Sequence, residues 1–172
     1  MVSSKHFRHL ESLYASSSEE RDTSRPAVSL GRAIIQATIE QNAPSPQELA
    51  NHTHYRELLS DAGALAAGSL VEDRLVASEQ FNLRVEEAGY SGPVTVSARV
   101  VLAQPPRYHV EVQLLDVYGD VLAVGTGVFT PSSVELPDAG DAGASTPTDN
   151  KRPEPAVYAS VWATPFGMVH LN

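Results

Sequence analysis

The residues best suited to chemistry lie in the ten-residue segment HTHYRELLSD, which ends at Asp61. Asp61 is the only acidic side chain between Glu57 and Glu72. On a helix its neighbours three positions before and four positions after are Leu58 and Leu65, so the carboxylate would lie on an apolar stripe, where desolvation should perturb its pKa. The pattern fits a catalytic acid or base, and it fits equally well a carboxylate satisfied by hydrogen bonds at a bend or an interface.

A helix over residues 55–71, YRELLSDAGALAAGSLV, would hold this carboxylate. Leucine, alanine and glycine fill nearly every face of it, and a helix so apolar must be surrounded by other parts of the protein. Gly63 and Gly68 would let neighbouring backbone approach closely. In the preceding stretch, QNAPSPQELANHT, Pro44 and Pro46 exclude a regular central strand, so a loop is predicted there, with room for one helical turn at PQEL.

Strand patterns dominate the rest of the chain up to Thr130. Residues 27–39 are rich in β-branched and apolar side chains and predict one strand, with Gly31 as a candidate bulge. Four further strands are predicted after the helix, because apolar and polar side chains alternate there as in half-buried antiparallel strands. These strands are LVASEQFNLRVEE, GPVTVSARVVLA, RYHVEVQLLDV and DVLAVGTGVFT, and the segment Asp116–Asp120 supplies the turn between the last two.

The two ends of the chain differ from this central part. Apolar side chains at helical spacing predict a short amphipathic helix over residues 5–15. After Thr130 the composition lacks hydrophobic density until an apolar end that carries Trp162, and this end either docks as an extra strand or is a loose tail. The predicted domain organisation is an N-terminal helix and loop at 1–26, a central domain at 27–130, and a linker with an apolar tail at 131–172.

The expected fold class is α+β, with an antiparallel sheet of about five strands wrapped around one long central helix. Such a sheet covers the helix well on one side only. Its other surface and its edges call for a partner, so a homodimer is the economical assembly.

The bulk properties exclude several classes of protein. A chain of 172 residues has the length of one domain with a real core, and a net charge of −9 argues against a nucleic-acid partner, because phosphate affinity depends on clustered basic side chains. No apolar run is long enough for a membrane span, and the N-terminus lacks an apolar signal-peptide core, so a cytoplasmic location is expected. The lack of cysteine excludes disulfides and thiolate zinc sites.

In their order and spacing these segments resemble hotdog-fold acyl-CoA thioesterases, in particular the PaaI-like (phenylacetyl-CoA thioesterase) group. The resemblance runs from Lys5 to Thr130. It rests on KHFRHLESLY, the central helix with Asp61, the block LVASEQFNLRVEEAGYSGPVTVSARVV and the closing LLDVYGDVLAVGTGVF. It implies a homodimer or tetramer that hydrolyses an acyl-CoA to free acid and CoA, with no cofactor, since CoA enters as part of the substrate.

The resemblance also implies a set of site residues. In the family a His-Gly-Gly motif precedes the helix, and an acidic residue follows the histidine by nine positions. Here His52 lies nine positions before Asp61, which matches the family spacing. The two glycines, however, are replaced by Thr53 and His54. Asp61 would be the general base or nucleophile, and backbone N–H groups at the helix start would stabilise the oxyanion. The missing glycines leave two outcomes open: activity with an altered substrate fit, or an inactive dimer that binds an acyl ligand or serves a structural role.

Weaker candidates surround this set. Ser78 falls where some relatives carry a hydroxyl that holds the attacking water, with Asn82 expected four residues further along the same face; an ordinary strand serine is the simpler interpretation. His52 and His54 could form a metal-binding pair, but the sequence offers no convincing third ligand. The two histidines are therefore expected to orient other groups or, if the protein is a hotdog dehydratase, to act as a base. Four strand or strand-edge cations could meet the CoA phosphates: Arg74, Arg84, Arg99 and Arg107.

Overall fold

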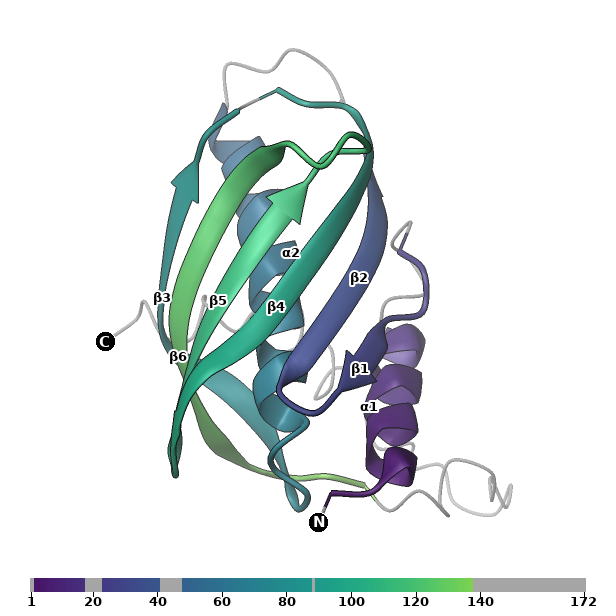
Figure 1. Cartoon of the computed structure of the whole chain (residues 1–172), viewed down its shortest axis with the longest axis vertical. Coiled ribbons are helices and arrows are strands. Elements are labelled where there is room, and N and C mark those ends of the chain that lie inside the picture. Colours follow the sequence, from purple (N-terminus) through teal and green to yellow (C-terminus); the bar gives the residue numbers. More distant parts are fainter. Residues whose placement is uncertain (1, 18–22, 41–47, 88, 138–172) are drawn as a thin grey trace, which may run out of the picture.

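The computed structural model describes residues 2–17, 23–40, 48–87 and 89–137, and of residues 48–53 the backbone alone. The predicted α+β architecture is confirmed: the described strands form one antiparallel sheet, and a long helix packs against one face of it (Figure 1). The sheet has six strands rather than about five, in the order β1-β2-β4-β5-β6-β3. The elements are α1 (Ser4–Ser17), β1 (Ala27–Ser29), β2 (Arg32–Ile39), α2 (Glu48–Gly68), β3 (Arg74–Val85), β4 (Gly92–Gln104), β5 (Arg107–Leu115) and β6 (Val121–Glu135).

The N-terminal helix predicted at 5–15 is confirmed as α1, which lies beside β1 at the edge of the sheet (Figure 1). Leu10 and Tyr14 are buried, and so is His6. The His6 Nε2 atom lies 2.8 Å from the carbonyl oxygen of Gly68, the last residue of α2, and Leu10 packs on the same glycine. One face of α1 therefore covers the C-terminal end of the central helix.

The sixth strand arises because residues 27–39 form two strands rather than one. Gly31 has a φ of +69°, a left-handed conformation that a residue with a side chain rarely adopts, and the chain reverses there. Ala27 consequently pairs with Ile34, and Ser29 pairs with Arg32. The predicted bulge at Gly31 is wrong; the glycine forms the turn of a tight hairpin.

The central helix also differs from its predicted bounds. It begins at Glu48, seven residues before the predicted start at 55, and ends at Gly68. The prediction of a loop over QNAPSPQELANHT, with room for a helical turn at PQEL, is therefore wrong over 50–53, whereas residues 41–47 lie outside the described residues. As a result His52, Thr53 and His54 belong to the helix and do not precede it.

The four strands after the helix are confirmed as β3 to β6. The predicted turn at Asp116–Asp120 joins β5 and β6, where the Asp116 carboxylate accepts hydrogen bonds from the backbone N–H groups of Tyr118 and Asp120. The last strand does not end at Thr130 as predicted: β6 runs to Glu135, and Pro131 and Glu135 pair with β3. The predicted linker and tail from 138 onward lie outside the described residues.

Glycines bring the helix and the sheet together. A Cβ atom built on Gly63 of α2 would lie 2.6 Å from the Phe129 ring of β6, and one built on Gly127 would lie 2.7 Å from the Phe81 ring of β3. The two rings meet edge to face, with centroids 6.3 Å apart. In the part of the chain that is described, no helix is long and apolar enough to cross a membrane.

Candidate active site

Asp61 lies in the middle of α2 and is 1% exposed. Its helical neighbours Leu58 and Leu65 are equally buried, so the predicted apolar surroundings of the carboxylate are confirmed. A carboxylate held in such surroundings loses most of its hydration, which is how proteins prepare an acidic group for proton transfer or nucleophilic attack.

The direction of Asp61 follows from Gly63. Gly63 contacts Phe129 and thus faces the sheet. Residues two positions apart in an α-helix differ by about 200° around the helix axis, so Asp61 points away from the sheet. Gly68 lies on the same side of α2 as Asp61, where it meets Leu10 of α1. Asp61 is therefore a buried acid on the back of the central helix.

Two further polar side chains share this face of α2. Because the helix begins at Glu48, His54 and Glu57 are helical and lie seven and four residues before Asp61, which places all three along one stripe. Both are half-buried. Sequence reasoning missed Glu57 as a site residue, although it lies within the predicted helix and its spacing of four from Asp61 would have revealed it. Among the described residues no group of three His, Cys, Asp or Glu side chains could hold a metal ion.

The backbone of residues 53–55 is not arranged as expected. In an α-helix only the backbone N–H groups of the first turn are free of helical hydrogen bonds, and here that turn is residues 48–51. The N–H groups of residues 53–55 in a regular helix donate to the carbonyls four residues before them. The expectation that Thr53 and His54 stand at the helix start is wrong. Of the side chains of His52 and Thr53 the structure describes nothing.

Two buried hydroxyls, on α2 and β3, are further candidate site groups. Ser78, on β3, is 3% exposed and is the cross-strand neighbour of Phe129, so it is on the face of the sheet that α2 covers. Ser60, which directly precedes Asp61, is fully buried. Neither hydroxyl has a hydrogen-bond partner among the described residues, which is costly for a buried polar group and leaves both able to bind a water molecule or a ligand. Sequence reasoning missed Ser60.

Asn82 does not accompany Ser78. The pairing of β3 with β6 passes from Ser78 opposite Phe129 to Gln80 opposite Val128, so Glu79 is an extra residue in a β-bulge. The bulge turns the rest of β3 over: Phe81 points inward and Asn82 is exposed on the outer face. The expectation that Ser78 and Asn82 share a face is wrong for this reason.

Tyr55 is a second buried group at the N-terminal half of α2. It is 1% exposed, and burial raises the pKa of its phenol above the ordinary value of 10.0. The nearby Tyr90 backbone lowers this pKa, without making a hydrogen bond of normal geometry, and the Glu87 carboxylate raises it by a smaller amount. Tyr55 therefore stays protonated and neutral at physiological pH.

The four arginines proposed to meet CoA phosphates already have carboxylate neighbours. Each lies within 4.0 Å of an acidic side chain: Arg74 with Asp73, Arg84 with Glu86, Arg99 with Glu111 and Arg107 with Glu79. All four are at least 47% exposed. Such pairs are typical of a solvated sheet surface.

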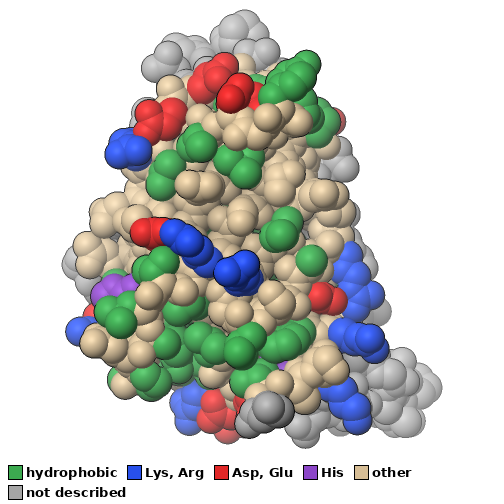
Figure 2. Space-filling view, in the orientation of Figure 1, with side chains coloured by type: hydrophobic (Ala, Val, Ile, Leu, Met, Phe, Trp, Pro, Cys, Tyr) green, Lys and Arg blue, Asp and Glu red, His purple; other side chains and the backbone are tan. Residues whose placement is uncertain are grey.

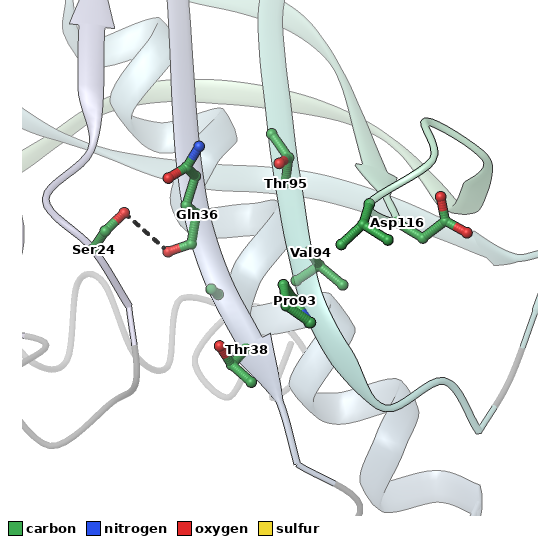
Figure 3. A pocket seen from close by; sticks show the side chains of 9 residues that line it. Ser24, Gln36, Thr38, Pro93, Val94, Thr95 and Asp116 are labelled. Atoms are coloured by element: carbon green, nitrogen blue, oxygen red, sulfur yellow. Dashed lines mark hydrogen bonds between the residues drawn. The ribbon is translucent and has the colours of Figure 1, made fainter.

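Three hollows lined by described residues lie on the outer face of the sheet, and neither Asp61 nor Ser78 lines any of these three. One of about 420 Å³ lies over the ends of β2 and β4, where Figure 3 shows Gln36, Thr38 and Thr95 between Ser24 and Asp116. Its Asp116 carboxylate is engaged by the β5–β6 turn, and the other polar groups are uncharged. This hollow is thus polar but offers no evident catalytic group.

Comparisons with known proteins identify the fold. No family model and no curated protein matches the sequence. The solved structure of the Escherichia coli PaaI protein from the phenylacetic acid degradation operon matches with a TM-score of 0.64 and 14% identity, covering 80% of this chain and 100% of that one. A thioesterase family protein from Silicibacter pomeroyi matches with a TM-score of 0.59 and 13% identity, over 72% and 96% of the two chains.

A third similar structure contains a ligand. The protein smu.793 from Streptococcus mutans, solved bound to acetyl-CoA, matches with a TM-score of 0.55 and 13% identity, over 66% of this chain and 90% of that one. At such identities the likeness concerns the fold. The chain has the hotdog fold of PaaI-like thioesterase structures, and the resemblance seen in the sequence is confirmed at that level.

Proposed function

We propose that the protein is a thioesterase that hydrolyses an acyl-CoA to the free acid and CoA, with Asp61 as its general base or nucleophile. The observation that carries this proposal is the burial of Asp61 among apolar side chains in the middle of the central helix. The hotdog fold, shared with thioesterase family proteins and with a protein bound to acetyl-CoA, supports it. No cofactor is needed, since CoA enters as part of the substrate.

Two chemical routes are open to Asp61. As a general base it takes a proton from water, whose oxygen attacks the thioester carbon, and the tetrahedral intermediate expels the CoA thiolate. As a nucleophile its carboxylate attacks that carbon itself, expels the thiolate and leaves an anhydride for water to cleave. The buried hydroxyls of Ser60 and Ser78, which have no hydrogen-bond partner among the described residues, would hold that water. Ser78 would do so only across an interface between protomers, because within one protomer it lies on the sheet side of α2 and Asp61 lies on the other side.

A second candidate function is favoured by the start of α2. Stabilisation of the oxyanion by backbone N–H groups requires donors that are free of helical hydrogen bonds. The helix that begins at Glu48 takes up the N–H groups of residues 53–55. The alternative is therefore a hotdog dimer that binds an acyl ligand, or has a structural role, without hydrolysing a thioester. In the thioesterase proposal the donors come from the first helical turn or from a partner subunit.

We also propose a homodimer, or a tetramer built from such dimers, that forms along β3. This strand is at the edge of the sheet, next to β6 only, and no other strand of the described residues pairs with its outer side. An unpaired edge of 12 residues is a ready template for pairing with a second copy. Ser78 would then lie close to the interface between two protomers.

The deciding experiment is thiol release from a panel of acyl-CoA substrates by the parent protein and by Asp61→Asn. We expect the variant to lose at least about 100-fold in kcat for the best substrate, the contribution typical of a positioned acid or base. The matched control is Asp73→Asn, which changes the same groups at a residue whose side chain is 82% exposed. It should keep the parent rate.

The outcomes separate the two candidate functions. Equal rates for the parent and Asp61→Asn would contradict the assigned role of Asp61. If the parent releases no thiol from any substrate but is stabilised against heat by acyl-CoA, the non-enzymatic function is correct. Sedimentation of each variant shows whether the oligomer is intact.

A further inference from the structure

Two arginines lie side by side on the outer face of the sheet, away from the central helix. Arg32 of β2 pairs directly with Arg99 of β4, and Arg99 pairs directly with Glu111 of β5. Figure 2 shows this face as largely uncharged, with basic side chains next to an acidic one near its middle. Like charges directly opposite each other destabilise an antiparallel pair, because their Cβ atoms are only about 5 Å apart.

The Glu111 carboxylate compensates the charge of Arg99 but not that of Arg32. The Arg99 Nη2 atom donates to Glu111 Oε2 over 3.0 Å. No carboxylate among the described residues lies within ion-pair distance of Arg32. The cross-strand row of Arg32, Arg99 and Glu111 therefore carries one uncompensated positive charge, located at Arg32. The net charge of the whole protein is −9.

Arg32 and Arg99 line a hollow of about 350 Å³ between β1, β2 and β4. The hydroxyl-bearing side chains of Ser29 and Ser97 line it as well. Ser29 is paired with Arg32, and Ser97 is two residues before Arg99 on the same face. Ser29, Arg32 and Arg99 thus form one cross-strand row at one end of the hollow, and Ser97 lies in the next row, an arrangement of guanidinium and hydroxyl donors that suits an oxyanion.

The next row of the hollow includes apolar side chains beside Ser97. Ile34, two residues after Arg32, is 44% exposed and is the cross-strand neighbour of Ser97. Its cross-strand neighbour Ala27 extends this apolar surface onto β1. An apolar patch beside a cation matches a ligand with a charged head and a short hydrocarbon body.

We propose that this hollow binds a small organic monoanion, a carboxylate with a short apolar body, whose oxygens accept hydrogen bonds from Arg32. A planar carboxylate fits the guanidinium fork bidentately. A single net charge at the site, in an acidic protein, favours a monoanion over a phosphate dianion. The site lies on the opposite face of the sheet from α2, so it is separate from Asp61 and does not depend on the proposed thioesterase activity.

The test is a titration of the isotope-labelled protein with hexanoate, followed through the arginine Nε–H and isoleucine methyl resonances. We expect saturable shifts at Arg32 and Ile34. Hexanamide, which lacks the charge, and acetate, which lacks the hydrocarbon body, should each bind at least about tenfold more weakly, because a charge-assisted hydrogen bond or several buried CH₂ groups are each worth a factor of this size.

Matched variants test whether Arg32 binds the carboxylate. Arg32→Gln should weaken hexanoate binding at least about tenfold, and Arg32→Lys, which keeps the charge but loses the fork, should give an intermediate affinity. Arg84→Gln removes a comparably exposed arginine from β3 and should bind like the parent. Unsaturable shifts, or equal affinity of Arg32→Gln and the parent, would overturn the site. Saturation by inorganic phosphate at lower concentration than by hexanoate would overturn the assignment to a carboxylate.

Discussion

At the scale of single residues, Tyr55 couples the stability of the fold to alkaline pH. Its phenol is buried in the folded protein, and burial raises its pKa above 10.0. The neutral form is thus favoured in the folded state, and the stability that this group contributes is fully present below pH 10.0. It is lost as the pH rises through the raised pKa, because the unfolded chain then releases the proton first.

We therefore expect Tyr55→Phe to remove part of the alkaline loss of stability. The free energy of unfolding, measured in urea at pH about 7.5 and about 10.5, should fall less in the variant than in the parent. At the lower pH the variant should be nearly as stable as the parent, because the hydroxyl it removes makes no hydrogen bond. Tyr118→Phe, at a residue that is 88% exposed, should behave like the parent. An unchanged alkaline loss in Tyr55→Phe would contradict this account.

Side-chain burial at the candidate site was predictable where the local pattern determined it. Asp61 is surrounded in sequence by leucine, alanine and glycine, so its burial followed directly from the helix. The position of Asn82 was not predictable, since a bulge at Glu79 depends on pairing with β6, a strand about 50 residues away. The uncompensated charge of Arg32 also depends on neighbours from other strands.

At the scale of elements, Gly63 sets the distance between α2 and the sheet. Gly63→Ala would place a methyl group 2.6 Å from the Phe129 ring, closer than packing allows, so the helix or the ring must move. We expect a loss of about 1–3 kcal/mol in the free energy of unfolding, measured in urea. Gly68→Ala is the matched control: its Cβ would lie 3.7 Å from Leu10, an ordinary contact.

A smaller residue at 129 makes this prediction more specific. If the clash with the ring causes the loss, Phe129→Leu should recover part of it in the Gly63→Ala background while destabilising the parent. Additive losses in the double variant would show that the two residues act independently and would contradict the packing explanation.

The types of the main elements followed from the sequence, but several of their ends did not. The alternation in β4 and β5 and the apolar density of α2 are local signals, and these elements formed as predicted. The start of α2 was misplaced because the loop indicated by Pro44 and Pro46 was extended to Thr53, although a proline restricts only its immediate neighbours and α2 begins at Glu48. The last residues of β6 contain a proline and two serines and form a strand because β3 pairs with them.

At the scale of the whole molecule, the net charge of −9 should affect the encounter with a CoA substrate. Both partners are negative, and salt screens their repulsion over about 10 Å at 0.1 M. If the proposed hydrolysis occurs, kcat/KM should rise severalfold as salt increases from about 10 to about 200 mM. A thioester without nucleotide phosphates, such as an acyl N-acetylcysteamine, should show no such rise. A fall with salt would indicate a locally basic route to the site.

The overall architecture could be predicted because one sheet must cover one apolar helix. The assembly could not be read from the chain in the same way, because the outer edge of β3 is defined only by which strands of the described sheet pair with it. The hairpin at Gly31 added a strand that no alternation pattern reveals, since β1 has only three residues.

The bulge in β3 affects any alignment that matches this strand to another sequence position by position. A relative without the equivalent of Glu79 would have the same inward side chains up to Ser78, yet every later residue would be displaced by one. Deleting Glu79 would leave Ser78, Gln80 and Phe81 in regular alternation opposite the same β6 residues, so Phe81 would still face inward. The deletion would also remove the carboxylate that Arg107 binds. Alignments of this strand are therefore meaningful only when its two halves are matched separately.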